Sequence, residues 1–233
     1  MKKVFTFAIV AVAAWMAVSC TEILDSLSKN PVFEMTNSKV YDGQKAFLGT
    51  TATCKIGWST DAPGVVTFDH DENGKNCTAW FNLPADEIKE VHVTATNLDD
   101  ESVDPYTCSF TIVPWKLTVC QKSGNEWKVV SRSNEPYFLW SERVDAGSSS
   151  FKVQMQALKS DGTFEDIENV TYKISLKDNS QKIDWQGTAL PESQKGETTA
   201  CSREFTIDKA PTATLSITAK LGAKTKEIRI LAK

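Results

Sequence analysis

A period of two in the apolar residues constrains this chain more than any other feature. The segments 151–157, 170–176 and 213–219 each alternate apolar side chains with Lys, Gln, Thr or Ser. Because successive side chains of a strand point to opposite faces of a sheet, each segment predicts a strand with one buried face. No window of twelve or more residues after the first twenty carries a helical stripe. We therefore expect an all-β fold.

Short turn sequences separate the expected strands. Asn73-Gly74 favours a tight hairpin, because both residues tolerate a positive φ angle. Similar turn signals lie at 123–125, 160–163 and 221–223. Short strands punctuated in this way predict a sandwich or a barrel. A single helical turn is expected after Pro84.

The length of 233 residues suits one large domain or two domains of about 100 residues each. We place a boundary near Pro114. Residues 31–114 hold about seven expected strands, the number found in one sandwich, and residues 115–233 hold a second set. The sequence therefore predicts two tandem β-sandwich domains.

Both predicted domains resemble bacterial immunoglobulin-like domains. In 31–114 the resemblance lies in residues 57–67 (Gly-Trp-Ser-Thr-Asp-Ala-Pro-Gly-Val-Val-Thr) and in the alternating strand 91–96. In 115–233 it lies in residues 160–163, leading to 170–172, and in residues 212–219. The resemblance implies an immunoglobulin-like β-sandwich in each half, and a fold of this kind does not by itself imply a function.

The first twenty residues have the features of a secretory signal. Lys2 and Lys3 precede an uncharged, mostly apolar run over residues 4–16, and Ala17-Val18-Ser19-Cys20 follows. A positive segment, an apolar run of this length and small residues before a cleavage point are typical of a signal peptide. The run is too short for a membrane-spanning helix, which needs about 20 apolar residues.

The end of this segment resembles bacterial lipoprotein precursors, in which cleavage falls just before a cysteine. The resemblance implies a signal peptide over residues 1–19, acylation of Cys20 (palmitate included) and a lipidated tether over residues 20–30. It also implies attachment to the cell envelope, in the outer membrane of a Gram-negative bacterium. Each buried CH₂ group contributes about 0.8 kcal/mol, so several acyl chains anchor a protein stably. The alternative is ordinary secretion with Cys20 as a spare thiol.

The charge of the chain excludes several partners. The net charge is −4, and removal of Lys2 and Lys3 with the signal peptide leaves 24 basic against 30 acidic residues, a net charge of −6. The sequence has no block of Lys and Arg, so we expect no nucleic-acid partner. An acidic chain gains no attraction to an anionic membrane, so attachment would depend on the lipid.

Two acidic loops are candidate metal sites. Residues 69–74 (Asp-His-Asp-Glu-Asn-Gly) provide the first ligands of a calcium loop, but Trp80 stands where a bidentate glutamate is required. A solvated hairpin explains the same residues, so we expect no metal, with a calcium site of another kind as the alternative. For residues 99–101 (Asp-Asp-Glu) we expect a solvated loop.

Catalytic motifs are absent from the sequence. His70 and His92 are its 2 histidines, and His92 is expected on the polar face of its strand. The sequence contains neither a Gly-x-Ser-x-Gly elbow nor a Gly-rich phosphate loop. We therefore expect no enzyme, no catalytic residue and no cofactor. A deep pocket with paired carboxylates would indicate a hydrolase instead.

The aromatic residues are the candidate binding groups. Trp58 is expected in the core of the first sandwich. Residues 80–81 and 137–140 place apolar groups on both faces of their strands. A planar ring on a surface strand can stack on a sugar or on a partner protein, and the alternative is packing between the domains. The candidate ligand contacts are Trp127, Tyr137, Trp140 and Trp185.

The cysteines leave the disulfide state open. Once Cys20 is assigned to the lipid, five remain: Cys54, Cys77, Cys108, Cys120 and Cys201. An odd number leaves at least one thiol free or intermolecular. The pairs 54–108, 54–77 and 120–201 are all possible in an oxidising envelope, and so are small buried thiols.

These features predict a non-catalytic envelope lipoprotein that acts as a surface binding, adhesion or structural module. The alternative is a glycan-binding surface lipoprotein of a polysaccharide-uptake system. Exposed, coplanar aromatic rings would favour the alternative. A flat apolar patch or an open edge strand would favour a protein partner.

Overall fold

The structure, a computed structural model, describes residues 29–35, 38–135, 137–167, 172–178, 184–185, 188–189, 196–198, 202–207, 210–211 and 214–231. For the strands between residues 172 and 198, and for Arg203, only the backbone is described. Cys20, Cys201 and the predicted signal peptide lie outside the described residues. Within the described ranges, no helix is long and apolar enough to cross a membrane.

Eight strands between Phe33 and Val113 form two four-stranded sheets, ordered β1-β3-β6-β5 and β2-β8-β7-β4. Strand β2 runs parallel to β8, and β4 runs antiparallel to β7. This is the order of an immunoglobulin-like sandwich, with strands A, B, E and D in one sheet and strands G, F and C in the other. The strands are β1 (Phe33–Glu34), β2 (Lys39–Tyr41), β3 (Lys45–Thr50), β4 (Ile56–Thr60), β5 (Val66–His70), β6 (Asn76–Phe81), β7 (Lys89–Asn97) and β8 (Tyr106–Val113).

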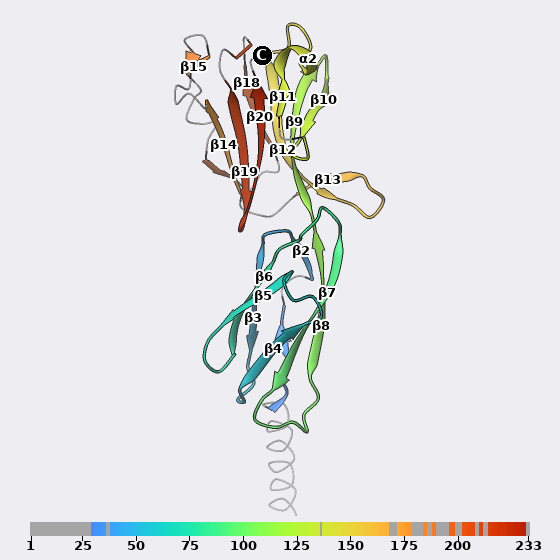
Figure 1. The fold of residues 1–233 in the computed structure, drawn as a ribbon, viewed down its shortest axis with the longest axis vertical. Helices are drawn as coiled ribbons and strands as arrows, with labels where there is room; N and C mark the ends of the chain where they lie inside the picture. The colour runs from blue at the N-terminus through green and yellow to red at the C-terminus, as the bar shows by residue number, and fades with distance from the viewer. Residues whose placement is uncertain are drawn as a thin grey trace, which may run out of the picture. The chain divides into compact units, whose positions relative to one another are not determined.

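Among the remaining described strands, β15 and β16 pair only with one another, and the others form two sheets that repeat this arrangement. One sheet has the order β10-β9-β12-β13, with β18 also paired to β12, and the other has the order β11-β20-β19-β14-β17. Figure 1 shows the red-brown strands β14 and β19 in one layer and the yellow-green strands β9, β10 and β12 in the other. The strands are β9 (Trp115–Ser123), β10 (Glu126–Arg132), β11 (Tyr137–Leu139), β12 (Ser150–Leu158), β13 (Phe164–Asp166), β14 (Tyr172–Asp178), β15 (Asp184–Trp185), β16 (Thr188–Ala189), β17 (Gly196–Thr198), β18 (Ser202–Thr206), β19 (Leu215–Leu221) and β20 (Lys224–Leu231).

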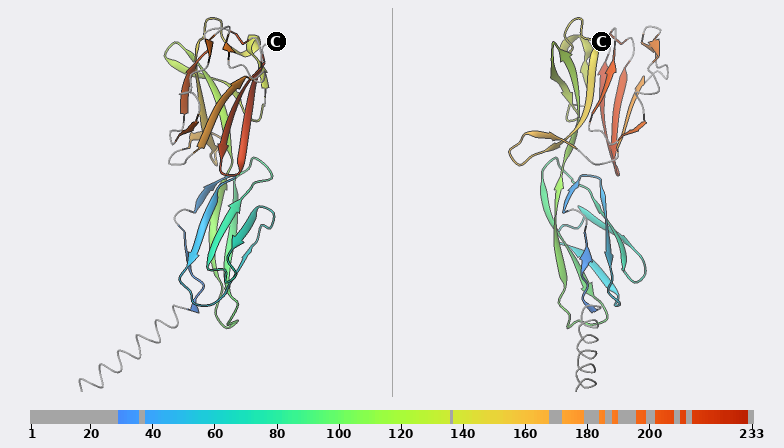
Figure 2. Two further views of the ribbon diagram at one scale, coloured as in Figure 1. Left: turned by 90° about the vertical axis from the view of Figure 1, so that its left-hand side faces the viewer. Right: turned by 180° about the vertical axis from the view of Figure 1, so that it is seen from behind.

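The two sets of strands share one topology. In each set an early strand pairs in parallel with the last strand, β2 with β8 and β11 with β20. The sheet then continues through the strand that precedes the last one, in the order β8-β7-β4 in the first set and β20-β19-β14 in the second. The left view of Figure 2 shows β14, β19 and β20 side by side. The chain is therefore all-β and immunoglobulin-like, as the sequence predicts.

The contacts divide the chain into two compact units. The first comprises Met1–Ser38, Ala46–Trp80 and Glu90–Phe110, and the second comprises Lys39–Lys45, Phe81–Lys89 and Thr111–Lys233. The tandem domains 31–114 and 115–233 stay a prediction from the sequence.

The alternation of apolar and polar residues along β12 and β19 determines which side chains form the core of the second unit. Phe151, Val153, Met155 and Ala157 of β12 are all fully buried, and they pack in one cluster with Leu215, Ile217 and Ala219 of β19. At about 25 cal/mol per Å² of apolar surface, burial of side chains of this size supplies the main stabilisation of the sandwich. The sequence predicts this alternation for both strands.

A polar cluster lies within the second unit. The indole nitrogen of the buried Trp115 donates a hydrogen bond of 2.9 Å to the carbonyl oxygen of Asp42, and Lys224 lies 3.6 Å from the Asp42 carboxylate. Asp86 accepts hydrogen bonds from Lys116 and Lys226. Burial raises the pKa of Asp86, but these two lysines outweigh burial and hold that pKa below its ordinary value.

The expected turns are present. Gly74, Gly124, Gly162 and Gly222 each have a positive φ angle, and each lies in the turn that joins two consecutive strands. The helical turn expected after Pro84 is wrong, because residues 84–87 form bends before β7 begins.

The structure also corrects the expected extended segment 137–140. Strand β11 ends at Leu139, and Trp140 begins a four-residue helix, α2 (Trp140–Arg143). Such a short helix leaves no helical period in the sequence.

Candidate functional site

Trp127 lies on the solvent-facing side of β10. It stands opposite Lys122 of β9, and the ammonium group of Lys152 on β12 lies 5.0 Å from the centroid of its ring. Two residues further along β10, Val129 has 40% of its surface exposed. The half-buried Trp127 and the exposed Val129 therefore lie next to one another on the same side of β10.

The register of the strands defines the surface around these two residues. The odd-numbered residues of β12 from Phe151 to Ala157 face the core, so the even-numbered ones face solvent. We call this side the outer face of the β9 sheet. By cross-strand pairing it carries Trp127, Val129 and Arg132 of β10; Lys116, Thr118, Cys120 and Lys122 of β9; Lys152, Gln154 and Gln156 of β12; Phe164 and Asp166 of β13; and Ser202 and Glu204 of β18.

Polar groups form the middle of the outer face. Thr118 donates a hydrogen bond of 3.1 Å to Gln156, whose amide nitrogen donates to Asp166 at 3.1 Å. Thr118 is fully buried and Gln154 is 8% exposed, because longer neighbouring side chains cover them. The Oε1 atom of Gln154 and the Nε atom of Arg132 are buried and have no hydrogen-bond partner among the described residues.

The charged groups of this face affect the pKa of the Cys120 thiol. Burial raises the pKa of its thiol, the charges of Lys152 and Arg132 lower that pKa, and the charge of Asp166 raises it. The register of the strands places these charged groups on the same face of the sheet as Cys120.

Tyr137 and Trp140 lie elsewhere. Tyr137 stands opposite Arg229 in the parallel pair β11–β20 and is 57% exposed, whereas its neighbour Phe138 faces the core. Tyr137 thus points outward from the sheet that packs against the β9 sheet, away from Trp127. Trp140 packs on the fully buried Phe151, with 5.3 Å between ring centroids.

The four predicted aromatic contacts therefore do not form one coplanar surface. The outer face of the β9 sheet holds Trp127, the opposite layer holds Tyr137, and Trp140 supports the core. Trp185 belongs to β15, and its side chain lies outside the description. Sequence reasoning missed Thr118, Arg132 and Gln154, whose side chains join Trp127 only through the pairing of strands distant in sequence.

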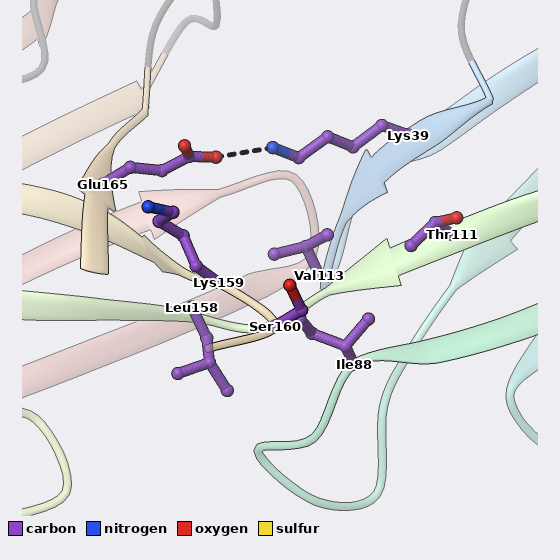
Figure 3. Close-up of a pocket in the computed structure, with 8 residues that line it drawn as sticks. All are labelled: Lys39, Ile88, Thr111, Val113, Leu158, Lys159, Ser160 and Glu165. Carbon is purple, nitrogen blue, oxygen red and sulfur yellow. Dashed lines mark hydrogen bonds and ion pairs between the residues drawn. The ribbon is translucent and has the colours of Figure 1, made fainter. Parts of the chain in front are cut away.

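A pocket of about 340 Å³ lies within the second unit. Figure 3 shows Lys39 and Glu165 at its rim, joined by an ion pair of 2.7 Å. The hydrogen bond between these residues raises the pKa of Lys39 and lowers that of Glu165. Both groups thereby stay ionised, and their opposite charges offset one another. The lining residues are Lys39, Ile88, Thr111, Val113, Leu158, Lys159, Ser160 and Glu165, a mixture of apolar and polar groups without paired carboxylates.

The histidine His92 lies on the polar face of β7, as predicted, between the buried Val91 and Val93. Its Nδ1 atom lies 2.7 Å from the Asp61 carboxylate. This hydrogen bond raises the pKa of His92. The backbone N–H of His92 and then its ring nitrogen donate to Asp61 and lower the pKa of that carboxyl.

The loop over residues 69–74 is a hairpin turn, as expected. The Asp71 carboxylate accepts hydrogen bonds from the backbone N–H groups of Lys75 and Asn76 and from the Asn76 side chain. The Asn76 side chain lowers the pKa of Asp71. The described part of the chain contains no cluster of three or more residues that could hold a metal ion.

The Trp58 side chain is half-buried, which differs from the core position expected. Its ring contacts Phe33, with 5.0 Å between centroids, and its indole nitrogen donates to the carbonyl oxygen of Gly74 at 2.7 Å. Trp58 lies on β4, the last strand of its sheet, where one side of the ring has no further strand to cover it.

The described cysteines Cys54, Cys77, Cys108 and Cys120 all carry free thiols. Cys77 is fully buried, and burial raises its pKa to about 12. The pairs 54–108 and 54–77 are therefore not formed, and Cys120 is not bonded.

Comparison with known proteins gives likenesses among solved structures alone, since no protein-family model and no curated protein matches the chain. Domains 5–6 of the S-layer protein SbsC share 14% identity, with a TM-score of 0.25 and coverage of 87% of this chain and 99% of that one. A chimeric titin Z1Z2 shares 11% identity, with a TM-score of 0.32 and coverage of 88% of this chain and 97% of that one.

Other likenesses are partial on the side of the known protein. Domains 3–5 of Drosophila OTK give 11% identity and a TM-score of 0.26, over 86% of this chain and 61% of that one. The Yersinia pseudotuberculosis adhesin InvE shares 10% identity, with a TM-score of 0.24, over 86% of this chain and 58% of that one. This chain thus spans less than two thirds of those two structures. At these identities and TM-scores the likenesses carry no inference about function.

Proposed function

We propose that this chain is a non-catalytic binding module of the bacterial cell envelope, anchored in the outer membrane by a lipid on Cys20. It acts at the cell surface in adhesion, in recognition or as a structural element. The observation that carries the proposal is the outer face of the β9 sheet, where Trp127 and the 40%-exposed Val129 stand side by side. A half-buried aromatic ring beside an exposed apolar side chain offers a contact surface to a partner.

Glycan binding within a polysaccharide-uptake system is the second candidate function. A specific observation favours it, because the Trp127 ring shares its face with Gln156 and with Thr118 and Gln154, which become accessible when the side chains that cover them move. An aromatic ring beside hydroxyl and amide groups offers a sugar both a stacking surface and hydrogen bonds.

The lipid anchor is tested by fractionating cells that produce the full chain. Cys20→Ala should move the protein from the membrane fraction to the soluble fraction, and Cys54→Ala should leave it with the membrane. A Cys20→Ala protein that stays membrane-bound with an uncut N-terminus would overturn the anchor.

The binding role is tested in intact cells with a photocrosslinking amino acid in place of Val129. We expect an adduct with a partner macromolecule, and no adduct when the same crosslinker replaces the exposed Lys55. In parallel, residues 21–233 are applied to a glycan array. The absence of both an adduct and a bound glycan would overturn the proposed function.

A further inference from the structure

Three cations of the outer face of the β9 sheet have no carboxylate partner among the described residues: Lys122, Arg132 and Lys152. The Lys152 ammonium lies over the ring of Trp127, and the Arg132 guanidinium carbon lies 4.8 Å from the centroid of Phe164. These positive charges belong to a chain whose net charge is −4. The face therefore carries the opposite sign to the whole molecule and attracts anions locally.

The two carboxylates of this face leave those cations unmatched. Asp166 lies beside Gln156, which donates a hydrogen bond to it. Glu204 stands opposite Lys152 at the β18 edge and forms no ion pair with any residue that the structure describes. A fourth cation, Lys116, is bound to Asp86. The unmatched charges thus lie at Lys122, Lys152 and Arg132, with Trp127 beside them.

One row across the strands holds an unpaired donor and an unpaired acceptor. Arg132, Thr118 and Gln154 are cross-strand neighbours in that order. The Nε–H of Arg132 and the Oε1 of Gln154 are both buried and have no partner among the described residues, and Gln154 is 8% exposed. The two outer residues of the row are two strand spacings apart, about 10 Å, so they do not satisfy one another. A hydroxyl group can donate to the acceptor and accept from the donor, and a sugar ring carries several hydroxyl groups.

We propose that the ligand of the outer face of the β9 sheet is an acidic polysaccharide whose negative charges are carboxylates, that is, a polyuronate. This inference rests on the proposed function and names its ligand. The carboxylates pair with Lys122, Lys152 and Arg132. The sugar hydroxyls bind Gln154 and Thr118, and one sugar ring stacks on Trp127. Arg132 changes its side-chain rotamer to open the row, a movement that is common at binding surfaces.

The test measures binding of residues 21–233 to polygalacturonate by isothermal titration calorimetry at low ionic strength. The matched control polymer is methyl-esterified polygalacturonate, which has the same backbone without the charge, and dextran sulfate supplies sulfate in place of carboxylate. We expect binding to polygalacturonate, with at least tenfold weaker binding to the other two polymers. Added salt should weaken the binding, because exposed charges are screened.

Substitutions identify the face. Lys152→Gln and Arg132→Gln should each weaken binding about tenfold, and Trp127→Ala should abolish it. Glu204→Gln should strengthen binding, because it removes a negative charge beside Lys152. Lys55→Gln is the matched control, since it removes one exposed positive charge from the other unit and should leave the affinity unchanged. Unfolding midpoints show that each variant is folded.

Several outcomes would overturn the inference. Equal affinity for the esterified polymer would show that the carboxylates are not recognised, and tighter binding to dextran sulfate would assign the face to sulfate. Equal losses in Lys55→Gln and Lys152→Gln would place the binding elsewhere. Binding of an acidic protein in place of polygalacturonate, or binding of neutral glycans alone, would overturn the inference while the proposed function stands. If no polymer binds, the polyuronate fails, and the crosslinking at position 129 decides the proposed function separately.

Discussion

The ammonium group of Lys152 lies 5.0 Å from the centroid of the Trp127 ring. This contact spans β9, because Trp127 belongs to β10 and Lys152 to β12. A cation over an aromatic face contributes about 0.5–1 kcal/mol at an exposed site. The contact is therefore weak enough for a ligand to replace.

Trp127 is expected to contribute little to stability. Trp127→Ala should change the free energy of unfolding by about 1 kcal/mol or less, because the ring lies on the solvent side and fills no core space. Phe151→Ala is the matched aromatic control from the core and should cost roughly 3–5 kcal/mol. Urea unfolding of both variants measures the difference, and equal losses would contradict the placement of Trp127.

Gly74 should resist substitution more strongly than Gly64. Both have positive φ angles, +71° and +91°, but a Cβ atom at Gly74 would lie 2.0 Å from the carbonyl oxygen of Ile56, whereas Gly64 has open space. We expect Gly64→Ala to cost about 1–2 kcal/mol for the backbone alone, and Gly74→Ala to cost roughly 2–5 kcal/mol. Thermal or urea unfolding compares the two, and a smaller loss at Gly74 would contradict the packing of this turn.

The pair of His92 and Asp61 should make stability depend on pH. The hydrogen bond with Asp61 raises the pKa of His92, so the contribution of His92 is complete below its ordinary value of 6.5 and is lost as pH rises through the raised pKa. The pKa of Asp61 is lowered by the His92 backbone and then its ring, so its contribution is present above 3.8 and is lost as pH falls through the lowered pKa.

An NMR titration of the His92 ring measures this coupling. Asp61→Asn keeps an oxygen that can accept from the His92 backbone but removes the charge, so it should lower the pKa of His92. An unchanged pKa in the variant would show that the ion pair is absent in solution.

The thiols should differ in reactivity. In residues 21–233 with Cys201→Ser, four thiols should react with a thiol reagent in denaturant without any reductant, since the four described cysteines are free. In the native protein the half-buried Cys108 should react first, and Cys77 last, because burial raises its pKa to about 12 and suppresses the thiolate. Cys108→Ser should remove the fast phase, and fewer than four thiols in denaturant would reveal a disulfide.

The sequence predicts the all-β fold well, because alternation alone determines which residues of β12 and β19 are buried. It identifies Trp127 as a candidate contact but not Arg132. Regular alternation would place Trp127, Val129 and Ser131 on one side. A bulge between Val129 and Ser131 turns Ser131 toward the core and Arg132 outward. No local signal in the sequence marks this bulge.

The remaining parts of the candidate site depend on which strands pair. Thr118, Gln154 and Ser202 meet in one row because β9, β12 and β18 are neighbours, although they are far apart along the chain. The pattern of the sequence predicts that Gln154 faces outward. It cannot predict that the Gln154 side chain is covered and left with an unpaired acceptor.

The most direct test of the central claim follows the indole N–H signals in ¹H–¹⁵N NMR spectra of residues 21–233 as polygalacturonate is added. The Trp127 signal should shift progressively with the polymer, whereas the signals of the fully buried Trp115 and of Trp58, which is hydrogen-bonded to Gly74, should stay in place. Methyl-esterified polymer at the same concentration should shift the Trp127 signal much less, because it binds at least tenfold more weakly. A Trp127 signal that does not move while the polymer binds would contradict the assignment of the outer face of the β9 sheet as the binding surface, and the absence of any binding would contradict the polyuronate as its ligand.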